Sequence, residues 1–250
     1  MSLEKNLVVC PVYNEVKTIE AFLENLRKHY RGDVLFVDDG SSDRGKEALA
    51  KAEGPATFLL RHPRRRGYGQ ALLSGFDFAL KQGYAKVVTL DADLQHNPKH
   101  IAAFLSGLRD YELVLGSRYI RIDRYFAVPR TRLVINRYIC GVLKVLFSLT
   151  VTDAFCGYRG YRDSFLKKAV LTEQSYGLAL EILLEAAEKQ VSFTEIPIEA
   201  IYFNTPRRFQ DGLDDPRLRL SYYLEVIARK QRKRNDEKEV LDSRAASGRR

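Results

Sequence analysis

Short, uninterrupted apolar runs alternate along the first half of the chain with segments in which apolar residues recur every three or four positions. The runs span residues 7–10, 34–37, 58–60, 87–90 and 113–115. The segments with helical spacing span residues 19–30, 48–52, 71–80 and 101–108. Short apolar runs are typical of buried strands, and a period near 3.6 is typical of helices. Their alternation predicts an α/β fold with a mostly parallel central sheet and helices on both faces.

Polar residues follow directly after each predicted strand. The five segments are Pro11-Val-Tyr-Asn-Glu15, Asp38-Asp-Gly-Ser-Ser-Asp43, Arg61-His62, Asp91-Ala-Asp93 and Gly116-Ser-Arg118. A sheet with only a structural role would need turn residues here, but it would not need acidic pairs or arginines. In open parallel sheets, ligands bind beyond the carboxyl ends of the strands. We therefore expect a binding site at this edge of the sheet.

The segment after the fourth predicted strand has the composition of a metal site. Asp91, Asp93 and Gln95 stand at alternate positions, and alternate residues of an extended chain project to the same side. Hard divalent cations such as Mg²⁺ and Mn²⁺ prefer oxygen ligands and keep positions open for substrate phosphates. One ion could therefore meet all three side chains. The alternative is a structural turn, because Asn97 followed by Pro98 has the form of a helix N-cap.

Length and composition indicate one large α/β domain or two small ones. The 250 residues are 45% apolar, which is enough for a hydrophobic core. The three cysteines, Cys10, Cys140 and Cys156, are too scattered for a disulfide framework, so we expect a reducing, cytosolic compartment. The N-terminus lacks the basic and then apolar pattern of a secretory signal.

The net charge of +9 favours a polyanionic partner, such as a nucleotide, nucleic acid or an anionic membrane. Arginines concentrate in residues 118–137, and the mixed-charge segment from Arg229 onward is typical of disorder or of a frayed helix. Arginine interleaved with aromatic residues also suits a nucleic-acid-binding module. That alternative leaves the paired carboxylates unexplained, because they would repel a polyanion. We therefore expect no nucleic acid partner.

Several common catalytic motifs are absent from the sequence. There is no G-x-x-x-x-G-K-[ST] phosphate loop, and Leu72 stands where a dinucleotide fingerprint needs its third glycine. No G-x-S-x-G nucleophile elbow supports serine hydrolase chemistry. His96 and His100 stand four residues apart and could share a helix face as metal ligands. We expect instead that both are solvated residues in the first turns of a helix.

Five motifs, in order and at five loop positions, resemble those of a known family. They are Pro11-Val-Tyr-Asn-Glu15, Val37-Asp-Asp-Gly-Ser-Ser-Asp43, Asp91-Ala-Asp-Leu-Gln-His96, Gly116-Ser-Arg-Tyr119 and Asp153-Ala-Phe-Cys-Gly-Tyr-Arg159. Over residues 6–205 the chain resembles the inverting nucleotide-sugar glycosyltransferases of the GT-A fold, specifically the dolichol-phosphate mannose synthase group. The resemblance implies a GT-A fold whose Rossmann-like half binds the nucleotide sugar.

The resemblance further implies a donor, GDP-mannose or UDP-glucose, and a Mg²⁺ or Mn²⁺ cofactor. Asp91 would lie near the sugar and the ribose, while Asp93 and Gln95 would hold the ion on the diphosphate. The residues implied at the base and ribose are Pro11, Tyr13, Glu15 and Asp39. A leaving nucleoside diphosphate develops negative charge as the glycosidic bond breaks, and a bound divalent ion neutralises it.

The acceptor implied by the resemblance is a polyprenyl (dolichyl) phosphate. Such a phosphate has its second pKa at about 6, so at neutral pH it is largely a dianion and needs no general base. Arg118, Arg132 and Arg207 are the residues implied at this phosphate, because the planar guanidinium binds phosphate oxygens in pairs. Arg118 and Arg132, with Asp91 and Asp93, are also the implied catalytic residues.

Asp153 and Glu181 complete the set of candidate site residues. Both match carboxylates of the family, but Glu181 is also spaced with Glu185 and Glu188 as in a plain solvated helix stripe. Relatives usually have Asn-x-Gly before the third helix, where this chain has Arg66-Gly67-Tyr68-Gly69. We therefore expect the local donor contacts to differ.

Residues 129–150 are expected to form a helix at a membrane surface. Arg137, Gly141, Lys144 and Ser148 fall on one stripe of this helix, and apolar residues fill the remainder. The segment is too short and too often charged to span a bilayer, but it suits an anionic interface. The alternative is a core helix buried under other elements.

These expectations combine into a glycosyltransferase domain over residues 1–216, followed by a C-terminal helix and a basic, disordered tail over residues 217–250. The enzyme would transfer a hexose, mannose first and glucose second, with inversion. It would act at the cytoplasmic face of a membrane, held by its own surface or by a membrane-anchoring partner protein. The alternatives are transfer of glucose or another sugar from a UDP-sugar, transfer to a saccharide or protein acceptor, and a non-catalytic nucleotide-sugar-binding protein.

Overall fold

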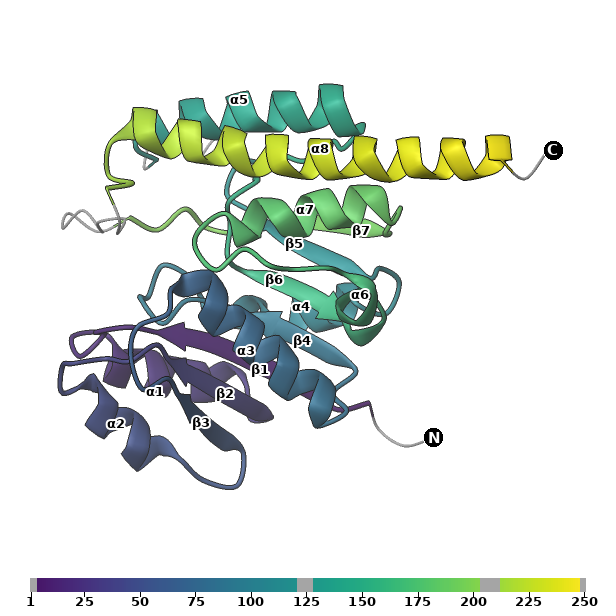
Figure 1. The fold of residues 1–250 in the computed structure, drawn as a ribbon. Coiled ribbons are helices and arrows are strands. Elements are labelled where there is room, and N and C mark those ends of the chain that lie inside the picture. Colours follow the sequence, from purple (N-terminus) through teal and green to yellow (C-terminus); the bar gives the residue numbers. More distant parts are fainter. Residues whose placement is uncertain (1–3, 121–127, 203–211, 248–250) are drawn as a thin grey trace. The chain divides into compact units, whose positions relative to one another are not determined.

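A computed structural model describes residues 4–120, 128–202 and 212–247 (Figure 1). Within these ranges, side chains are described except at positions 46, 234, 235 and 237–247. The chain forms two compact units, Met1–Pro206 and Arg207–Arg250. The sequence suggests this boundary a few residues later, after residue 216. The site residues that the structure describes all lie in the first unit.

The first unit is built on one sheet with the strand order β3-β2-β1-β4-β6-β5-β7. Its strands are β1 (Asn6–Val12), β2 (Asp33–Asp38), β3 (Thr57–Arg61), β4 (Lys86–Thr89), β5 (Leu113–Ser117), β6 (Arg159–Arg162) and β7 (Phe193–Pro197). β6 is antiparallel to both of its neighbours, β4 and β5, and the other neighbouring strands are parallel. The five apolar runs all form strands, which confirms the expected mostly parallel sheet.

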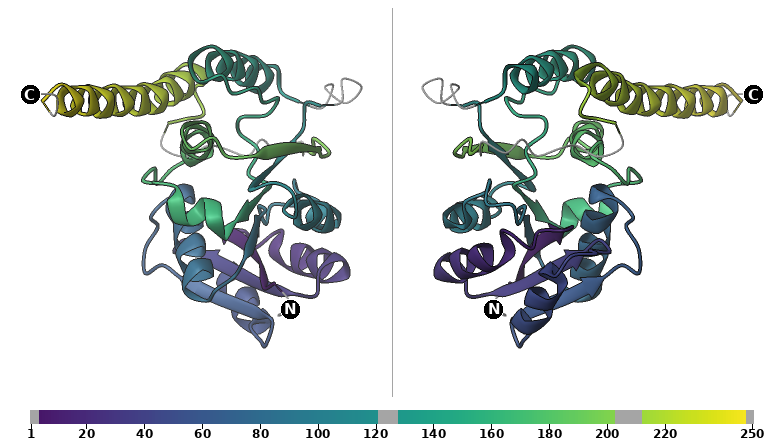
Figure 2. Two further views of the ribbon diagram at one scale, coloured as in Figure 1. Left: turned by 90° about the vertical axis from the view of Figure 1, so that its right-hand side faces the viewer. Right: turned by 90° about the vertical axis from the view of Figure 1, so that its left-hand side faces the viewer.

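Helices cover both faces of this sheet (Figure 2). The helices of the first unit are α1 (Ile19–His29), α2 (Gly45–Ala52), α3 (Tyr68–Lys81), the 3₁₀ helix η1 (Pro98–His100), α4 (Ile101–Gly107), α5 (Arg130–Phe147), α6 (Asp163–Lys168) and α7 (Leu178–Glu188). α1 and α4 lie on one face, and α3 and α6 lie on the other. The Asn97 side chain accepts a hydrogen bond from the Lys99 N–H (3.1 Å), which confirms the predicted N-cap.

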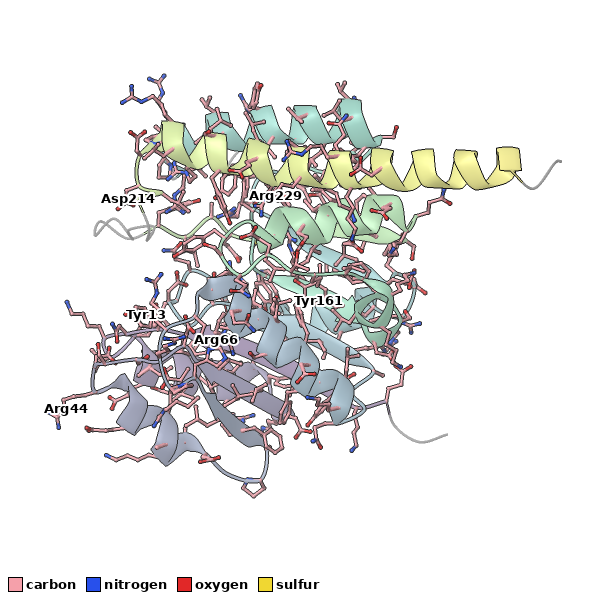
Figure 3. All side chains as sticks on the ribbon, in the orientation of Figure 1. Tyr13, Arg44, Arg66, Tyr161, Asp214 and Arg229 are labelled. Atoms are coloured by element: carbon pink, nitrogen blue, oxygen red, sulfur yellow. The ribbon has the colours of Figure 1, made fainter. Side chains whose placement is uncertain are left out.

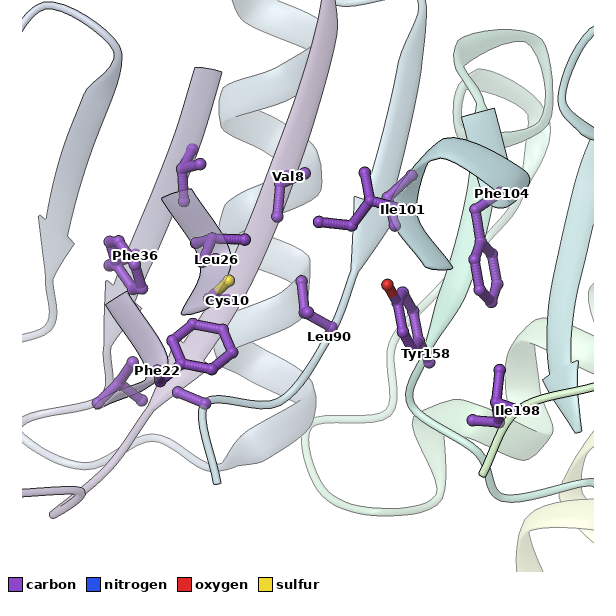
Figure 4. Close-up of a cluster of buried hydrophobic side chains, with 14 of the residues drawn as sticks. Val8, Cys10, Phe22, Leu26, Phe36, Leu90, Ile101, Phe104, Tyr158 and Ile198 are labelled. Atoms are coloured by element: carbon purple, nitrogen blue, oxygen red, sulfur yellow. The ribbon is translucent and has the colours of Figure 1, made fainter. Parts of the chain in front are cut away.

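Alternate residues of β1 supply the cores on the two faces of the sheet. Val8 and Cys10 belong to a buried cluster with residues of α1, α2 and α4 (Figure 4). Val9 points to the other face, where α3 approaches so closely that a Cβ on Gly75 would lie 2.5 Å from Val9 Cγ1. The strand is therefore apolar throughout because both of its faces are covered.

Aromatic side chains pack a loop of the site against the core that contains Val8 and Cys10. Phe104 of α4 stacks on Tyr158, with ring centroids 4.3 Å apart. Tyr158 belongs to the predicted motif of residues 153–159, and it is fully buried. Burying a large aromatic side chain contributes about 1.5–3 kcal/mol. This packing anchors the segment that enters β6.

The second unit contains helix α8 (Pro216–Ser247). Asp215 precedes the helix, and its Oδ1 accepts a hydrogen bond from the Arg217 N–H (2.8 Å). A capping aspartate followed by proline at the first helical position is a common helix start. The helical backbone continues past Arg229 to Ser247, into the segment for which the sequence leaves disorder or a frayed helix open.

Candidate functional site

The loops that follow β1 and β2 are joined by hydrogen bonds at the carboxyl edge of the sheet. Asn14 Oδ1 accepts hydrogen bonds from the N–H groups of Ser42 (2.8 Å) and Asp43 (3.2 Å). Asp43 Oδ2 accepts one from the Val16 N–H (2.9 Å). Asn14 has a φ of 55°, a left-handed conformation that asparagine tolerates better than most residues. The first two sequence motifs therefore form one surface.

Pro11 and Glu15 are two of the residues expected at the base and ribose, and both lie at the edge of this surface. Pro11 is buried in β1. The pairing of β1 with β4 ends at Val9, two residues earlier. Pro11 lacks an N–H group, but no hydrogen bond to β4 is lost at this position. The Glu15 carboxylate accepts a hydrogen bond from Thr18 Oγ1 (3.0 Å), just before α1. Both residues lie where β1 leads into its helix.

Tyr13, the third candidate, is half-buried beside a basic segment. The Arg65 guanidinium lies 5.2 Å from the Tyr13 ring centroid, within cation–π range. Residues 64–66 are all arginines and are exposed, and Figure 3 shows Arg66 and Tyr13 at this edge. The edge therefore offers an aromatic face and several cations, a combination that suits a nucleotide.

Asp39, the fourth candidate, is buried and holds the loop after β3. Its Oδ1 is 2.7 Å from His62 Nδ1 and accepts a hydrogen bond from the Arg66 N–H (2.8 Å). Its Oδ2 accepts one from the Gly67 N–H (2.8 Å). His62 is also buried, and its Nε2 lies 2.9 Å from Ser74 Oγ. Asp39 thus shapes the loop between β3 and α3.

The segment with Asp91, Asp93 and Gln95 is a turn and not an extended chain. β4 ends at Thr89, and Leu94 has a φ of 65°. Asp93 Oδ1 accepts a hydrogen bond from the Gln95 N–H (3.0 Å), as aspartate commonly does two residues before a turn closes. The expectation of an extended chain over these residues is therefore wrong, because the backbone bends between Asp91 and Gln95.

Asp91 is fixed from two directions by side chains that the sequence analysis did not assign to the site. The Tyr68 hydroxyl donates a hydrogen bond to Asp91 Oδ1 (2.9 Å). His96 Nδ1 accepts one from the Asp91 N–H (2.9 Å). Burial lowers the pKa of His96, which keeps its ring neutral and able to accept. Its Nε2 lies 3.9 Å from Cys156 Sγ.

The expectation that His96 and His100 are solvated is therefore wrong for His96, which is buried. The ring of His96 lies 5.3 Å from that of Tyr158. His100 Nε2 lies 2.6 Å from Glu199 Oε2, and Lys99 bonds the other oxygen. Burial opposes ionisation of Glu199, but hydrogen bonds from Lys99 and His100 lower its pKa to about 2. Packing against the core, and not helix exposure, decides the position of His96.

Arg118 and Asp153 form a buried ion pair with two hydrogen bonds. Arg118 Nε donates to Asp153 Oδ2 (2.7 Å), and Nη2 donates to Oδ1 (2.9 Å). Burial alone would raise the pKa of Asp153, but the Arg118 guanidinium lowers it below its usual value. Asp153 precedes β6, whose first residue pairs with the end of β4. This pairing brings Asp153 to the carboxyl edge, beside the end of β5.

Tyr202 connects the two candidate acceptor arginines. Arg118 Nη1 donates to the Tyr202 hydroxyl (3.3 Å). The Arg132 guanidinium, from α5, lies 5.5 Å from the Tyr202 ring centroid. The structure therefore brings Arg118 and Arg132 to one tyrosine, although nothing in the sequence pattern marked Tyr202. Arg207, the third candidate, lies outside the described residues.

Glu181 accepts hydrogen bonds from the loop that precedes α7. Its Oε2 accepts from the N–H groups of Thr172 and Glu173, both at 2.8 Å. One turn later, Glu185 is buried and accepts from the Val170 N–H (2.8 Å). The alternative of a plain solvated stripe is therefore wrong at Glu185, which is buried and bonded to this loop.

Helix α5 has both a buried face and an exposed apolar face. Ile135, Ile139 and Leu143 are buried, as expected of a core helix. Val134 and Tyr138 are 65% and 53% exposed, which an ordinary core helix would not require. In the part of the chain that the structure describes, we find no helix with both the length and the apolar character of a membrane span.

Asp93 and Gln95 fit a hard divalent cation by the chemistry of their donor atoms. Both present oxygen, the ligand that Mg²⁺ and Mn²⁺ prefer. Across the described ranges, no three His, Cys, Asp or Glu residues gather into a metal site of their own. An ion held here would take its remaining ligands from water and from a substrate diphosphate. The residues present therefore fit an ion that binds together with a nucleotide.

Residues 7–170 match the model of the family described as Glycosyl transferase family 2. A curated relative, undecaprenyl-phosphate mannosyltransferase from Micrococcus luteus, is 31% identical over 198 residues, which are 77% of this chain and 82% of the relative. UDP-N-acetylglucosamine–dolichyl-phosphate N-acetylglucosaminyltransferase from Methanococcus voltae is 30% identical over 215 residues, which are 78% of this chain and 85% of that relative.

The fold matches that of solved glycosyltransferases. Glucosyl-3-phosphoglycerate synthase from Mycobacterium tuberculosis, in complex with Mn²⁺, UDP and glucosyl-3-phosphoglycerate, superposes with a TM-score of 0.69. The match covers 91% of this chain and 80% of that chain at 17% identity. At this identity the similarity establishes the GT-A fold alone. Together with the family match over the motifs of the sheet edge, it identifies the chain as a glycosyltransferase that belongs to glycosyl transferase family 2.

Proposed function

We propose that the chain transfers a hexose, mannose first and glucose second, from a nucleotide diphosphate to a polyprenyl phosphate. The two relatives described above are both named for a polyprenyl phosphate acceptor. Their names differ in the sugar, which is mannose in one and N-acetylglucosamine in the other. The names of these two relatives therefore support the kind of acceptor more than the kind of sugar.

The observation that carries the proposal is the meeting of Arg118 and Arg132 at Tyr202. Arg118 follows β5 and Arg132 lies in the first turn of α5, yet both contact the same tyrosine. The bonds to Asp153 and Tyr202 use three of the five N–H donors of Arg118. The other donors and the second guanidinium suit a phosphate dianion, which arginine binds through paired oxygens.

The proposed reaction needs no protein base. An oxygen of the acceptor phosphate dianion attacks the anomeric carbon from the face opposite the nucleotide. The bond between this carbon and the diphosphate oxygen breaks, and the nucleoside diphosphate takes the electron pair. The products are an inverted glycosyl phosphate lipid and the nucleoside diphosphate. The task left to Arg118 and Arg132 is to hold the nucleophile in line, because positioning alone can supply much of the rate.

On the donor side, Asp91 would contact the sugar and ribose, and Pro11, Tyr13, Glu15 and Asp39 would form the base and ribose site. Asp93 and Gln95 would hold Mg²⁺ or Mn²⁺, which when bound stabilises the negative charge of the departing diphosphate. The exposed arginines beside Tyr13 add positive charge at the same edge. These residues bind and orient the donor.

The lipid part of the acceptor suggests that the protein acts at the cytoplasmic surface of a membrane. Val134, Tyr138 and Val145 are exposed apolar side chains of α5, at helical spacings of four and seven residues. Arg137 and Lys144, seven residues apart, are exposed beside them. An exposed apolar stripe with neighbouring cations suits an anionic lipid interface, at about 1 kcal/mol per basic side chain. A membrane-anchoring partner protein would act in addition to this surface.

Turnover with defined substrates tests the proposal. Purified protein, Mn²⁺ and a short polyprenyl phosphate should convert GDP-mannose or UDP-glucose into a glycosyl phosphate lipid that mass spectrometry detects. Full activity on a soluble saccharide, with none on the lipid phosphate, would favour the saccharide acceptor. Binding of nucleotide sugars without any turnover would favour a non-catalytic binding protein.

A further inference from the structure

We propose that Tyr68 positions the Asp91 carboxylate for the donor sugar, and that the loop of residues 170–176 holds Tyr68 in place. This inference rests on the proposed function of Asp91, and it assigns a role to the segment Arg66-Gly67-Tyr68-Gly69, which departs from the pattern of related chains. Tyr68 is the first residue of α3 and acts through Asp91, so it is a positioning residue.

A hydrogen bond joins the side chains of Tyr68 and Asp91. The Tyr68 hydroxyl lies 2.9 Å from Asp91 Oδ1. Burial and the neighbouring Asp91 raise the pKa of Tyr68 well above its usual value, so the hydroxyl stays protonated and donates. The backbone of Asp91 is held separately by His96. With one bond on the backbone and one on the carboxylate, Asp91 has a defined orientation.

The Tyr68 ring is in turn supported by the loop of residues 170–176. Tyr176 stacks on it, with ring centroids 5.6 Å apart and an interplanar angle of 14°. The Gln70 N–H donates to the Gln174 carbonyl oxygen (3.0 Å). A Cβ on Gly69 would lie 2.6 Å from the Gln174 carbonyl carbon, so glycine is needed for this close approach. The loop of residues 170–176 therefore rests directly on the start of α3.

That loop is anchored by two carboxylates of α7. Glu181 accepts hydrogen bonds from Thr172 and Glu173, and Glu185 accepts one from Val170. These carboxylates hold the loop to α7. A continuous chain of contacts thus leads from α7 through the loop and Tyr68 to the Asp91 carboxylate, and it gives Glu181 a supporting role.

Gly157 leaves space beside the hydrogen bond between Tyr68 and Asp91. A Cβ on Gly157 would lie 2.5 Å from the Tyr68 hydroxyl and 3.3 Å from Asp91 Oδ2. Gly157 is held in place by the hydrogen bond from Thr89 Oγ1 to its carbonyl oxygen (2.7 Å). The absent side chain leaves room for the Tyr68 hydroxyl beside Asp91. A substitution at Gly157 can therefore disturb the hydrogen bond between Tyr68 and Asp91 without changing either residue.

Tyr68→Phe tests the role of the hydroxyl, because it keeps the ring and its stacking on Tyr176. We expect kcat/KM for the nucleotide sugar to fall about 10- to 100-fold, the effect of losing one hydrogen bond to a charged group. The affinity for the bare nucleoside diphosphate, measured by calorimetry with UDP and GDP, should fall much less, because these ligands lack the sugar and offer Asp91 only the ribose. A merely structural role would weaken both kinds of ligand alike.

Tyr84→Phe is the matched control. The Tyr84 hydroxyl donates to Asp33 Oδ2 (2.7 Å), which is the same chemistry at the amino end of β2. This variant should lose stability to a similar degree and keep its kcat/KM. If Tyr84→Phe lowered kcat/KM as much as Tyr68→Phe, the effect would be one of stability and the proposal would be wrong.

Gly157→Ala supplies a second, independent test. In the parent protein the new methyl group clashes with the Tyr68 hydroxyl, and we expect kcat/KM to fall. In the Tyr68→Phe background the clashing oxygen is absent, so the same substitution should have a smaller effect. Equal effects of Gly157→Ala in both backgrounds would overturn the proposed arrangement.

Different results would contradict the proposed function and the positioning role of Tyr68. If the unmodified protein turns over no nucleotide sugar with any lipid phosphate, the proposed function is wrong. If it turns over a nucleotide sugar and Tyr68→Phe does so equally well, the function stands and the positioning role of Tyr68 is wrong.

Discussion

Arg118 and Asp153 meet through two parallel hydrogen bonds, from Nε to Oδ2 at 2.7 Å and from Nη2 to Oδ1 at 2.9 Å. Both side chains are largely buried, and Asp153 is completely so. Each charge therefore depends on the other, since an unpaired buried charge is costly. The pair also fixes the direction in which the Arg118 guanidinium faces Tyr202.

Replacement of Arg118 should affect stability and catalysis together. Arg118→Lys keeps the charge but cannot form two parallel bonds, and Arg118→Ala leaves Asp153 unpaired. We expect Arg118→Ala to lower the free energy of unfolding by about 3–5 kcal/mol, and Arg118→Lys to lower it by less. Urea denaturation measures this, with the exposed Arg109→Lys as control. Equal stability of Arg118→Ala and the parent would contradict the structural role of the pair.

Kinetic measurements should distinguish an acceptor-binding arginine from the residues that bind the donor. Arg132→Ala removes the guanidinium over Tyr202 and leaves the Arg118–Asp153 pair intact. We expect a higher KM for the polyprenyl phosphate, by about 10-fold or more, because an arginine–phosphate interaction is charge-assisted. The KM for the nucleotide sugar should change little. An equal rise in both KM values would place Arg132 on the donor instead.

Asp93→Asn tests the proposed metal site. The amide keeps the size of the side chain but removes its charge, which weakens the binding of a hard cation. We expect the Mn²⁺ concentration that gives half-maximal activity to rise, and kcat to fall about 100-fold or more as the leaving group loses electrostatic stabilisation. Manganese titration of the initial rate gives both values. Unchanged activity of this variant in the presence of a chelator would refute a metal role for Asp93.

The buried, neutral His96 predicts a loss of stability in mild acid. Its pKa is lowered in the folded protein, so as pH falls below about 6.5 the unfolded chain takes up a proton that the folded protein does not. The free energy of unfolding should therefore decrease from that pH downward, until the lower pKa of the folded state is reached. Denaturation between pH 8 and pH 5 should show a weaker slope for His96→Gln, with His29→Gln as an exposed control. An identical slope in both variants would refute this assignment.

Exposed residues of α5 predict salt-dependent binding to anionic vesicles. Tyr138→Asp places a negative charge in the apolar stripe and should greatly reduce co-sedimentation with phosphatidylglycerol vesicles. Arg137→Gln should weaken binding by about 1 kcal/mol, mainly at low salt. Tyr111→Asp changes an exposed tyrosine outside α5 and serves as the control. If Tyr138→Asp bound vesicles as well as the control does, α5 would not be the membrane surface.

The hydrophobic pattern predicts the first five strands because each contains an unbroken apolar run. Four of these strands are buried on both faces, and β3, at the edge of the sheet, is half-buried. It misses β6 and β7, since Arg159-Gly-Tyr-Arg162 and Phe193-Thr-Glu-Ile-Pro197 mix polar and apolar residues. Arg159 of β6 is buried although it is charged, because its guanidinium donates hydrogen bonds to three backbone carbonyl oxygens. These acceptors come together only in the folded protein. Local pattern alone contains no sign of it.

Four of the five motifs of the site are visible in the sequence because they follow directly on strands, whereas Asp153 precedes β6 and only the family resemblance indicates it. The roles of Tyr68, His96 and Tyr202 are not visible in this way, because each depends on a contact with a residue distant in the sequence. His96 resembles an ordinary polar residue at a helix start until Cys156 and Tyr158 enclose it. Tyr202 is one of fourteen tyrosines, and only the approach of two arginines distinguishes it.

The reversed direction of β6 determines where this protein can be altered safely. Residues that precede β6 lie beside the chemistry, whereas those that follow it lie at the amino end of β4, where the Asp163 N–H bonds the Ala85 carbonyl oxygen. Lys167, exposed on α6, is on that remote side. A fluorophore or an affinity tether attached at Lys167 would therefore report on the enzyme, or immobilise it, without obstructing either substrate.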